Sequence, residues 1–205
     1  MSASTEPLSA EEFSTPPAEP MGLLKIWFDS AVADGVRQPG ALALATTDAE
    51  GRVTNRIVAV LAVRDNGLVF ASHVDSRKGR DLAETGRASG VLFWREADRQ
   101  VIVTGTGRPL PHAESDALWA ARPVDMHPMS VASHQSAPLL DEEALRQEAR
   151  QLGSAGVALP RPDRWLGYLL EPASVEFWQA APDRLHRRLR YERDGSTWQA
   201  GRLQP

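Results

Sequence analysis

The sequence predicts a mainly β protein with helices, in which short antiparallel strands form a Greek-key or split β-barrel. Six or seven short runs with strand-like composition are separated by turn residues, as is typical of small barrels. The pair Asn66-Gly67 between two of these runs is a strong hairpin signal. Segments with helical spacing of apolar residues interrupt the runs, so helices are expected around the barrel.

Composition excludes several classes of protein. None of the 205 residues is cysteine, so disulfides, thiolate metal sites, iron–sulfur clusters and a catalytic thiol are excluded. The net charge of −4 gives no general reason to expect nucleic-acid or membrane binding. No stretch approaches the roughly 20 apolar residues of a membrane span. Residues 1–20 lack the basic start and apolar core of a signal peptide, so we expect a cytoplasmic protein.

The chain is expected to begin with a tail and a helix. Residues 1–20 are rich in Ser, Pro and Glu, which predicts a mobile N-terminal tail before a single domain over residues 21–205. Apolar side chains then recur at helical spacing over residues 20–35. Pro20 at the start and Gly35 at the end are typical helix boundaries.

Three strands are expected after this helix, over residues 41–47, 56–63 and 68–73. The middle run, RIVAVLAV, is almost continuously apolar, which predicts burial on both of its faces. In a barrel this small, the outer face of such a strand is expected to meet a second subunit, which favours a homodimer.

The remaining elements are helices between pairs of strands. A short helix over residues 76–86 is expected to be capped by Ser76 or Asp75 and to end near Gly86. The others, in chain order, are strands over residues 88–94 and 99–110, helices over residues 112–122 and 141–153, and strands over residues 168–179, 184–193 and 196–204.

Two basic motifs indicate anion binding. The motif SRKG places Ser76, Arg77 and Lys78 at a predicted helix N-terminus, where backbone N–H groups, the helix dipole and two cations suit a phosphate. A basic first turn on a solvated helix face is the common alternative. The motif RLHRR, on a strand, would place Arg184 and Arg188 on one face around a histidine. They repel one another unless an anion or electron-rich ligand lies over them, and an exposed strand face is the alternative.

Residues 122–136, RPVDMHPMSVASHQS, are dense in histidine and methionine and are open to interpretation as a metal site, a packed loop or a pocket wall. His127 and His134 have no carboxylate or third histidine at ligand spacing, so we expect no metal. Methionines suit irregular or aromatic surfaces, which is consistent with a pocket wall.

Taken in order, these motifs resemble the pyridoxine/pyridoxamine 5′-phosphate oxidase family, whose members are FMN-dependent split-barrel homodimers. The resemblance runs in register from roughly Leu24 to Pro205. The motifs that carry it are RIV from Arg56, SRKG at 76–79, RQV at 99–101, RP at 122–123, SHQS at 133–136, EFW at 176–178, RLHRR at 184–188 and the ending RLQP.

The resemblance implies a set of site residues around FMN at a subunit interface. Basic contacts to FMN, with two serines nearby, are expected from Arg56, Arg77, Lys78, Ser72 and Ser136. Contacts to the ribityl chain and the flavin ring are expected from Gln100, Gln135, Trp178 and Arg188. Two residues on the substrate side of the ring are expected to be catalytic, Arg184 and His186.

Departures from the family pattern bear on the substrate. Vitamin B6 oxidases grip the substrate phosphate with a lysine, a tyrosine, an arginine and a serine, and only the arginine, Arg122, remains in this chain. The other positions are Leu61, Leu118 and Met126, against which a phosphate would be desolvated without partners, at a cost of several kcal/mol.

The motif HPMS resembles the branch of the family that serves phenazine biosynthesis. This implies an oxidase that dehydrogenates a reduced tricyclic phenazine carboxylate and passes electrons to oxygen. The pocket would be lined by Leu61, Leu118, Met126 and Met129, with Arg122, His127, Arg184 and His186 available to the carboxylates or the reacting ring.

Three other functions remain open. A vitamin B6 phosphate oxidase is disfavoured by the apolar pocket positions. A non-catalytic split-barrel flavin carrier or sensor would have no need of Arg184 and His186. An FMN reductase with a nicotinamide donor lacks a nucleotide-binding feature, because GTGRPL does not open a helix.

Overall fold

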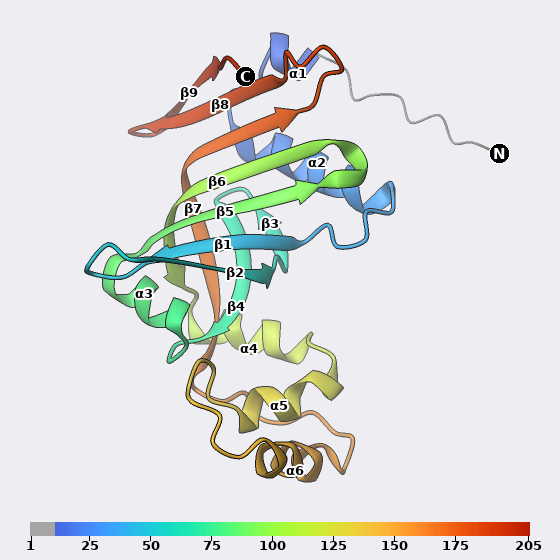
Figure 1. Ribbon diagram of the computed structural model, residues 1–205, viewed down its shortest axis with the longest axis vertical. Coiled ribbons are helices and arrows are strands. Elements are labelled where there is room, and N and C mark those ends of the chain that lie inside the picture. The colour runs from blue at the N-terminus through green and yellow to red at the C-terminus, as the bar shows by residue number, and fades with distance from the viewer. Residues whose placement is uncertain (1–10) are drawn as a thin grey trace, which may run out of the picture.

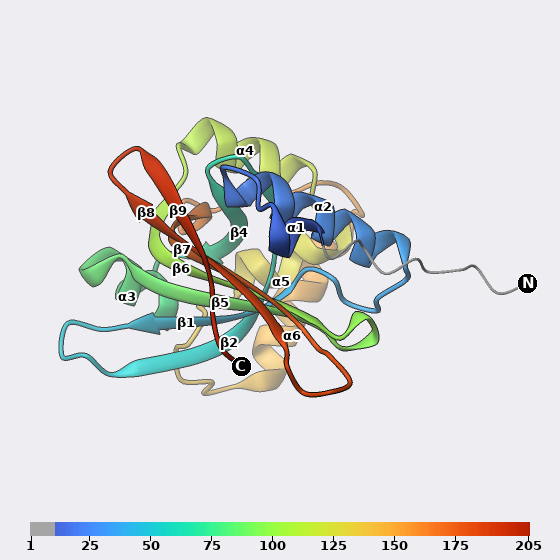
Figure 2. The same ribbon diagram turned by 90° about the horizontal axis from the view of Figure 1, so that it is seen from above.

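Residues 11–205 are described by a computed structural model, in which nine antiparallel strands form one sheet (Figure 1). The strands are β1 (Ala41–Thr47), β2 (Val53–Ala59), β3 (Ala62–Arg64), β4 (Gly67–His73), β5 (Arg87–Trp94), β6 (Arg99–Pro109), β7 (Trp165–Gln179), β8 (Arg187–Asp194) and β9 (Thr197–Arg202). Their order is β2-β1-β5-β6-β7-β4-β3, and β8 and β9 extend the sheet from β7. In Figure 2 the strands β8 and β9 cross over β1 and β2 at a steep angle, so the sheet is strongly curled.

Helices surround the curled sheet on two sides. They are α1 (Glu11–Ser14), α2 (Pro20–Ala33), α3 (Arg77–Thr85), α4 (His112–Ala120), α5 (His127–Ala132) and α6 (Glu142–Gly153), with short 3-10 helices η1 (Arg95–Ala97) and η2 (Val124–Met126). Helices α4, α5 and α6 gather at one end of the molecule, whereas α1 and α2 lie toward the opposite end (Figure 1). The predicted mainly β fold with helices is confirmed, and within the described residues no helix is long and apolar enough to cross a membrane.

Strand β7 organises the sheet because it pairs with three other strands. Its first part pairs with β4, its last part pairs with β8, and β6 pairs with it along almost its whole length. The β6–β7 register shifts next to Gly105, where a Cβ atom would lie 2.0 Å from the carbonyl oxygen of Glu171. Glycine is therefore required at this bend, which lets one strand reach both ends of the molecule.

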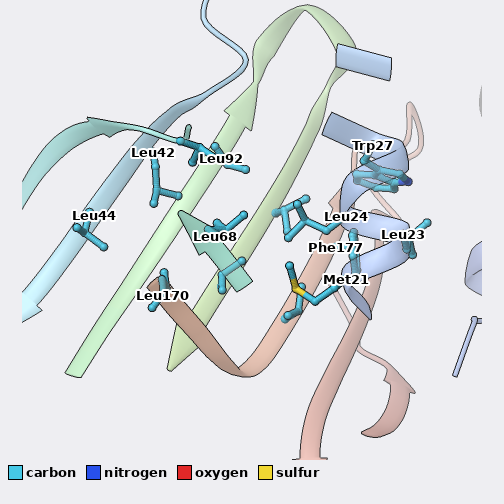
Figure 3. Packing of buried hydrophobic residues seen from close by; sticks show 14 of the residues in the cluster. Met21, Leu23, Leu24, Trp27, Leu42, Leu44, Leu68, Leu92, Leu170 and Phe177 are labelled. Atoms are coloured by element: carbon cyan, nitrogen blue, oxygen red, sulfur yellow. The ribbon is translucent and has the colours of Figure 1, made fainter. Parts of the chain in front are cut away.

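The main core lies between α2 and the concave face of the sheet (Figure 3). Leu24 and Trp27 of α2 are completely or almost completely buried, and the Trp27 ring meets Phe177 of β7 edge-on at 5.2 Å. Burying each such side chain contributes roughly 1.5–3 kcal/mol to folding. The helical spacing that predicted α2 therefore reflects the face that this helix packs against the sheet.

The apolar run over residues 56–63 differs from its prediction as one strand buried on both faces. It is divided between β2 and β3, because Val60 N–H donates to Gly40 and Leu61 N–H donates to Val69. The chain thus leaves the β1 side of the sheet and joins β4. On β2, Ile57 is 65% exposed in the single chain, so the outer face of this strand is uncovered.

The predicted strand over residues 184–193 begins later, at Arg187. Residues 181–186 form a turn in which Arg184 N–H donates to the Ala181 carbonyl and Leu185 N–H donates to the Asp183 carboxylate. Arg184 has a φ of 66°, in the left-handed region. The prediction that Arg184 shares a strand face with Arg188 is therefore wrong, because this turn interrupts the extended backbone.

Part of the segment expected to be a mobile tail packs against the body of the protein. Phe13 of α1 is buried, its ring lies 6.1 Å from that of Trp27, and its carbonyl accepts a hydrogen bond from Arg202. Tyr191 of β8 donates to the Pro17 carbonyl. Residues 1–10 of the predicted tail lie outside the described residues.

Candidate functional site

The N-terminus of α3 lies directly after β4 and carries the motif SRKG. Ser76 caps the helix, since its side chain accepts a hydrogen bond from Gly79 N–H, and Gly86 ends the helix with a left-handed φ of 66°. The Oγ atoms of Ser72 and Ser76 are 3.1 Å apart, and both serines are buried. The predicted cap, helix and serine neighbour are therefore brought together at one place.

Arg77 is held by two buried carboxylates. Its Nε lies 2.9 Å from Asp81 and its Nη2 lies 2.6 Å from Asp48. Burial alone would raise the pKa of Asp81, but hydrogen bonds from Thr46, Thr54 and Arg77 hold that pKa below its ordinary value. The charge of Arg77 is thus compensated within the chain.

Arg56 of β2 reaches the same buried carboxylate from the sheet. Its Nη1 donates to Thr46 at 2.7 Å and to the Leu44 carbonyl at 3.2 Å. Its Nη2 lies 4.0 Å from Asp81. Burial lowers the pKa of Arg56 below its ordinary value, and Arg56 remains a cation at neutral pH.

Lys78 is the cation of this group without an acidic partner among the residues that the structure describes. Its Nζ donates to Ser76 Oγ at 3.3 Å and to Gln135 Oε1 at 3.2 Å. Burial, and then the nearby charge of Arg56, lower the pKa of Lys78. An anion placed here would relieve this unfavourable environment, so the donor set fits a phosphate.

The loop over residues 133–136 covers the start of α3 through three contacts. Ser136 Oγ accepts a hydrogen bond from Arg77 N–H at 3.2 Å, and Gln135 meets Lys78. Nδ1 of His134 lies 3.3 Å from the Asp75 carboxylate. Ser136 has a φ of 69°, a strained value for a residue with a side chain. The structure therefore brings Gln135 and Ser136 to the predicted phosphate contacts.

A second group of predicted residues lies where β6, β7 and β8 pair. Gln100 is opposite Trp178, which is opposite Arg188 on its other side. Arg188 Nε donates to Glu176 at 2.7 Å, and its Nη1 donates to the Gln204 carbonyl at 2.9 Å. The last residues of the chain therefore help to fix this arginine.

The two residues predicted to be catalytic lie on the turn beside this second group. The imidazole of His186 lies 4.9 Å from the Trp178 ring, and its Nδ1 accepts a hydrogen bond from Ala181 N–H. The neutral ring therefore carries its proton on Nε2, which leaves that atom available as a donor. Arg184 is exposed, and its guanidinium has no hydrogen-bond or acidic partner within the described chain.

The two groups lie far apart in one chain. Ser72 pairs with Leu166 at the beginning of β7, whereas Gln100 pairs with Trp178 near its end. Strands rise about 3.3 Å per residue, so roughly 40 Å of strand backbone lies between these pairs. Figures 1 and 2 both show α3 and the β7–β8 turn on opposite sides of the molecule. The two groups of predicted flavin contacts therefore lie on opposite sides of one chain.

The predicted substrate wall lies by α4, η2 and the edge formed by β3 and β4. Leu118 packs against the cluster that contains Val69, and Leu61 N–H donates to the Val69 carbonyl. Leu61, Met126 and Met129 are about half exposed in the single chain. These exposed apolar side chains are therefore accessible to a ligand or to another chain.

The predicted carboxylate-binding residues Arg122 and His127 differ in whether their side-chain nitrogen atoms are free to bind a ligand. His127 is buried and stacks on Trp119 at 4.2 Å, with Leu159 N–H donating to its Nδ1 and its Nε2 donating to the Arg122 carbonyl. Both ring nitrogens are occupied, so His127 fixes the segment. Arg122 Nη2 contacts Ser130, but its Nε is buried without a partner in the described residues.

Sequence reasoning did not identify Asp48, Asp81 and Arg164 as site neighbours. Asp81 follows Arg77 by four residues on one helix, which is the spacing of a helical ion pair and could have been noticed. Asp48 is in a distant turn and gave no such signal.

Within the described residues, no group of three or more acidic or histidine side chains could hold a metal.

Two models of known protein families match this chain, each over a different range of residues. A model of the pyridoxamine 5′-phosphate oxidase family matches residues 28–154. A model of the pyridoxine 5′-phosphate oxidase C-terminal dimerisation region matches residues 165–205, which contain Trp178, Arg184, His186 and Arg188.

Individual relatives carry two different names. The dihydrophenazinedicarboxylate synthase of Burkholderia lata is 54% identical over 194 residues, covering 95% of this chain and 92% of that protein. The pyridoxine/pyridoxamine 5′-phosphate oxidase of Bordetella pertussis is 42% identical over 189 residues, covering 92% and 90%. The crystal structure of PhzG from Burkholderia lata, in complex with tetrahydrophenazine-1-carboxylic acid, matches with a TM-score of 0.93 and covers 95% of this chain and 96% of that one.

Proposed function

Because this chain belongs to the pyridoxamine 5′-phosphate oxidase family, we propose that it is an FMN-dependent oxidase of phenazine biosynthesis. It dehydrogenates a reduced tricyclic phenazine carboxylate, and O2 takes up the electrons. The observation that carries this choice of substrate is the apolar surface that Leu61, Leu118 and Met126 each expose, with the cationic Arg122 four residues before Met126. A flat apolar ring system with a carboxylate suits this surface, whereas a phosphate dianion would be desolvated there without partners.

The family implies a flavin, and the start of α3 supports FMN as its form. Lys78 and Arg56, with Ser72 and Ser136 nearby, would hold a terminal phosphate at a helix N-terminus. Arg77 would contribute less, since Asp48 and Asp81 already bind its guanidinium. This unequal division between neighbouring cations is specific enough to be tested.

A second copy of the chain would complete the site. The residues around Lys78 are proposed to bind the FMN phosphate, and the residues around Trp178 are proposed to bind the flavin ring. These two sets lie on opposite sides of one chain, so one flavin would take its contacts from two chains. The exposed outer face of β2 and the match to a dimerisation region support a homodimer with FMN between the subunits. The same proposal treats residues 21–205 as one domain of a cytoplasmic enzyme.

The chain's own residues would bind and orient the reduced substrate. A bound flavin supplies the two-electron acceptor. Arg184, with its exposed and unpaired guanidinium, suits a substrate carboxylate, and the buried Nε of Arg122 offers a second donor. His186, whose Nδ1 is fixed by the backbone, can present Nε2–H to the substrate as a hydrogen-bond donor and so orient it for oxidation.

Oxygen uptake by the purified protein tests the proposal. Steady consumption of O2 with a reduced phenazine carboxylate, together with product analysis, is expected. Uptake with pyridoxamine 5′-phosphate alone would support the vitamin B6 oxidase instead, a function that a relative of 42% identity carries. Flavin binding without uptake on either substrate would support a carrier.

A further inference from the structure

Arg164 lies between the two chain segments that carry the proposed phosphate contacts. It precedes β7 and touches a segment on each side, although it belongs to none of the motifs recognised in the sequence. Its backbone carbonyl accepts a hydrogen bond from Val74 N–H at 2.7 Å, in the turn that leads into α3. Its side chain reaches the other way, to the end of α5.

The guanidinium of Arg164 holds the entrance to the loop over residues 133–136. Its Nη2 donates to the Val131 carbonyl and, at 3.3 Å, to the Ser133 carbonyl. Carbonyls at the end of a helix have no partner within the helix and carry partial negative charge, so a cation there is favourable. Two residues later, Gln135 meets Lys78.

The loop depends on this support because its backbone is strained. Ser136 has a left-handed φ of 69°, which costs energy for a residue with a side chain and persists only where surrounding contacts enforce it. Those contacts are Arg164 at the beginning of the loop, Asp75 beside His134, and Arg77 N–H on Ser136 Oγ.

We propose that Arg164 is a positioning residue for the cofactor: it sets the spacing between the start of α3 and the 133–136 loop so that Lys78, Gln135 and Ser136 meet one phosphate. This inference rests on the proposed FMN function. Arg164 touches both segments but is not itself expected to contact FMN. Its effect on FMN affinity should therefore pass through the loop.

A double-mutant cycle measures whether the effect passes through the loop. FMN affinity is determined by quenching of flavin fluorescence for Arg164→Met in two backgrounds, the unaltered chain and the Gln135→Ala,Ser136→Ala loop variant. In the unaltered chain, Arg164→Met should weaken FMN binding about tenfold, the loss expected for a charge-assisted hydrogen bond. In the loop variant the same change should have little further effect, because coupled residues are not additive. Arg164→Lys should recover part of the affinity.

Arg161 provides a matched control on the same segment. It is also a partly buried arginine that donates to backbone carbonyls, with Nη1 at 2.7 Å from Trp165 O, but it contacts Asp116 on α4 and neither cofactor segment. Arg161→Met should lower the thermal stability of the FMN-free protein about as much as Arg164→Met, while leaving FMN affinity within twofold.

The outcomes separate this inference from the proposed function. Equal losses of affinity for Arg161→Met and Arg164→Met, or additive losses in the cycle, would show a general structural role and overturn the inference. An unaltered chain that does not bind FMN would overturn both the inference and the proposed function. If Arg164→Met does not fold, Arg164→Gln removes the charge with a smaller change in shape and takes its place in the same cycle.

Discussion

The Nε of Arg77 lies 2.9 Å from the carboxylate of Asp81, one helical turn further along α3, and that carboxylate is 2% exposed. Asp48 binds the same guanidinium from the β1–β2 turn. Neighbouring cations at the start of one helix therefore have different tasks. Arg77 ties the helix to the sheet, whereas the charge of Lys78 is available to a ligand.

Lys78→Ala should weaken FMN binding more than Arg77→Ala does. Removing the uncompensated cation loses a charge-assisted contact of about 1.5–3 kcal/mol, which corresponds to at least a tenfold rise in the FMN dissociation constant. Arg77→Ala should instead lower the stability of the FMN-free protein, because Asp48 and Asp81 lose their partner. Fluorescence titration and urea unfolding of both variants measure the two effects. The reverse order of FMN affinities would contradict this division.

Asp81→Asn should destabilise the protein by about 2–3 kcal/mol, because hydrogen bonds from charged groups to a buried carboxylate are lost or weakened. The affected partners are Arg77, Thr46 and Thr54. Urea unfolding of the FMN-free protein measures the change. Asp29→Asn is the control, since Asp29 forms an exposed pair with Lys25 and should lose no more than about 0.5 kcal/mol. Similar losses in both variants would show that Asp81 is not a structural centre.

The stability of the protein should fall as pH decreases from 6.5 toward 4. Burial lowers the pKa of His73 to about 4 from 6.5, with Asp75 opposing and Arg164 and Lys78 assisting. The unfolded chain therefore binds protons more readily than the folded chain, so stability is retained above pH 6.5 and lost below it. The loss should be on the order of 3 kcal/mol.

The variant His73→Leu measures how much of the loss of stability at low pH comes from His73. Urea unfolding at pH 7 and pH 5 should show a smaller loss on acidification in this variant than in the unaltered chain. His134→Ala serves as the control because His134 is exposed, and it should retain most of the acid sensitivity. Equal pH dependence in His73→Leu and the unaltered chain would exclude His73 as the source.

Local signals in the sequence predicted much of the fold. Ser76, Gly86 and the Asn66-Gly67 turn are read correctly because each acts on its own backbone neighbours. The division between β2 and β3 was not predicted, because an apolar run does not reveal that Val60 and Leu61 pair with different strands.

The candidate site was predicted in part for the same reason. The family resemblance placed Lys78 and Gln135 around the same cofactor but in different groups of contacts, and the structure places their side chains 3.2 Å apart. The salt bridge from Asp48 to Arg77 and the hydrogen bond from Arg164 to the 133–136 loop each join segments that are distant in the chain. No periodicity in the sequence relates these segments to one another. The left-handed φ of Arg184 also depends on the turn's own hydrogen bonds.

Arg184→Ala and His186→Ala should each lower turnover of the reduced phenazine carboxylate while FMN remains bound. The guanidinium of Arg184 has no partner in the described chain, and His186 has one backbone hydrogen bond and one ring contact with Trp178, so neither change should unfold the protein. Loss of a group that orients the substrate typically costs about 10²-fold in rate. Turnover and FMN fluorescence are measured on the same samples. Leu185→Ala, an exposed neighbour on the turn, is the control and should keep its rate.

The choice of substrate should be reversible at three positions. The unaltered chain is expected to turn over pyridoxamine 5′-phosphate far more slowly than about 1 s⁻¹, the low end of ordinary enzymatic rates. Leu61→Lys, Leu118→Tyr and Met126→Ser together place one cation and two hydroxyl donors beside Arg122, and charge-assisted bonds are the strong ones for phosphate. The triple variant should bind pyridoxal 5′-phosphate more tightly, as measured by absorbance titration.

The same triple variant should also bind the phenazine substrate less tightly than the unaltered chain does. The same three changes remove apolar surface that the tricyclic ring would cover, so the Michaelis constant for the reduced phenazine carboxylate should rise while FMN affinity is unchanged. Leu139→Lys adds a cation at a position that is 60% exposed and outside the predicted wall, and should change neither substrate. If the unaltered chain oxidises pyridoxamine 5′-phosphate at about 1 s⁻¹ or faster, the apolar wall does not determine the substrate.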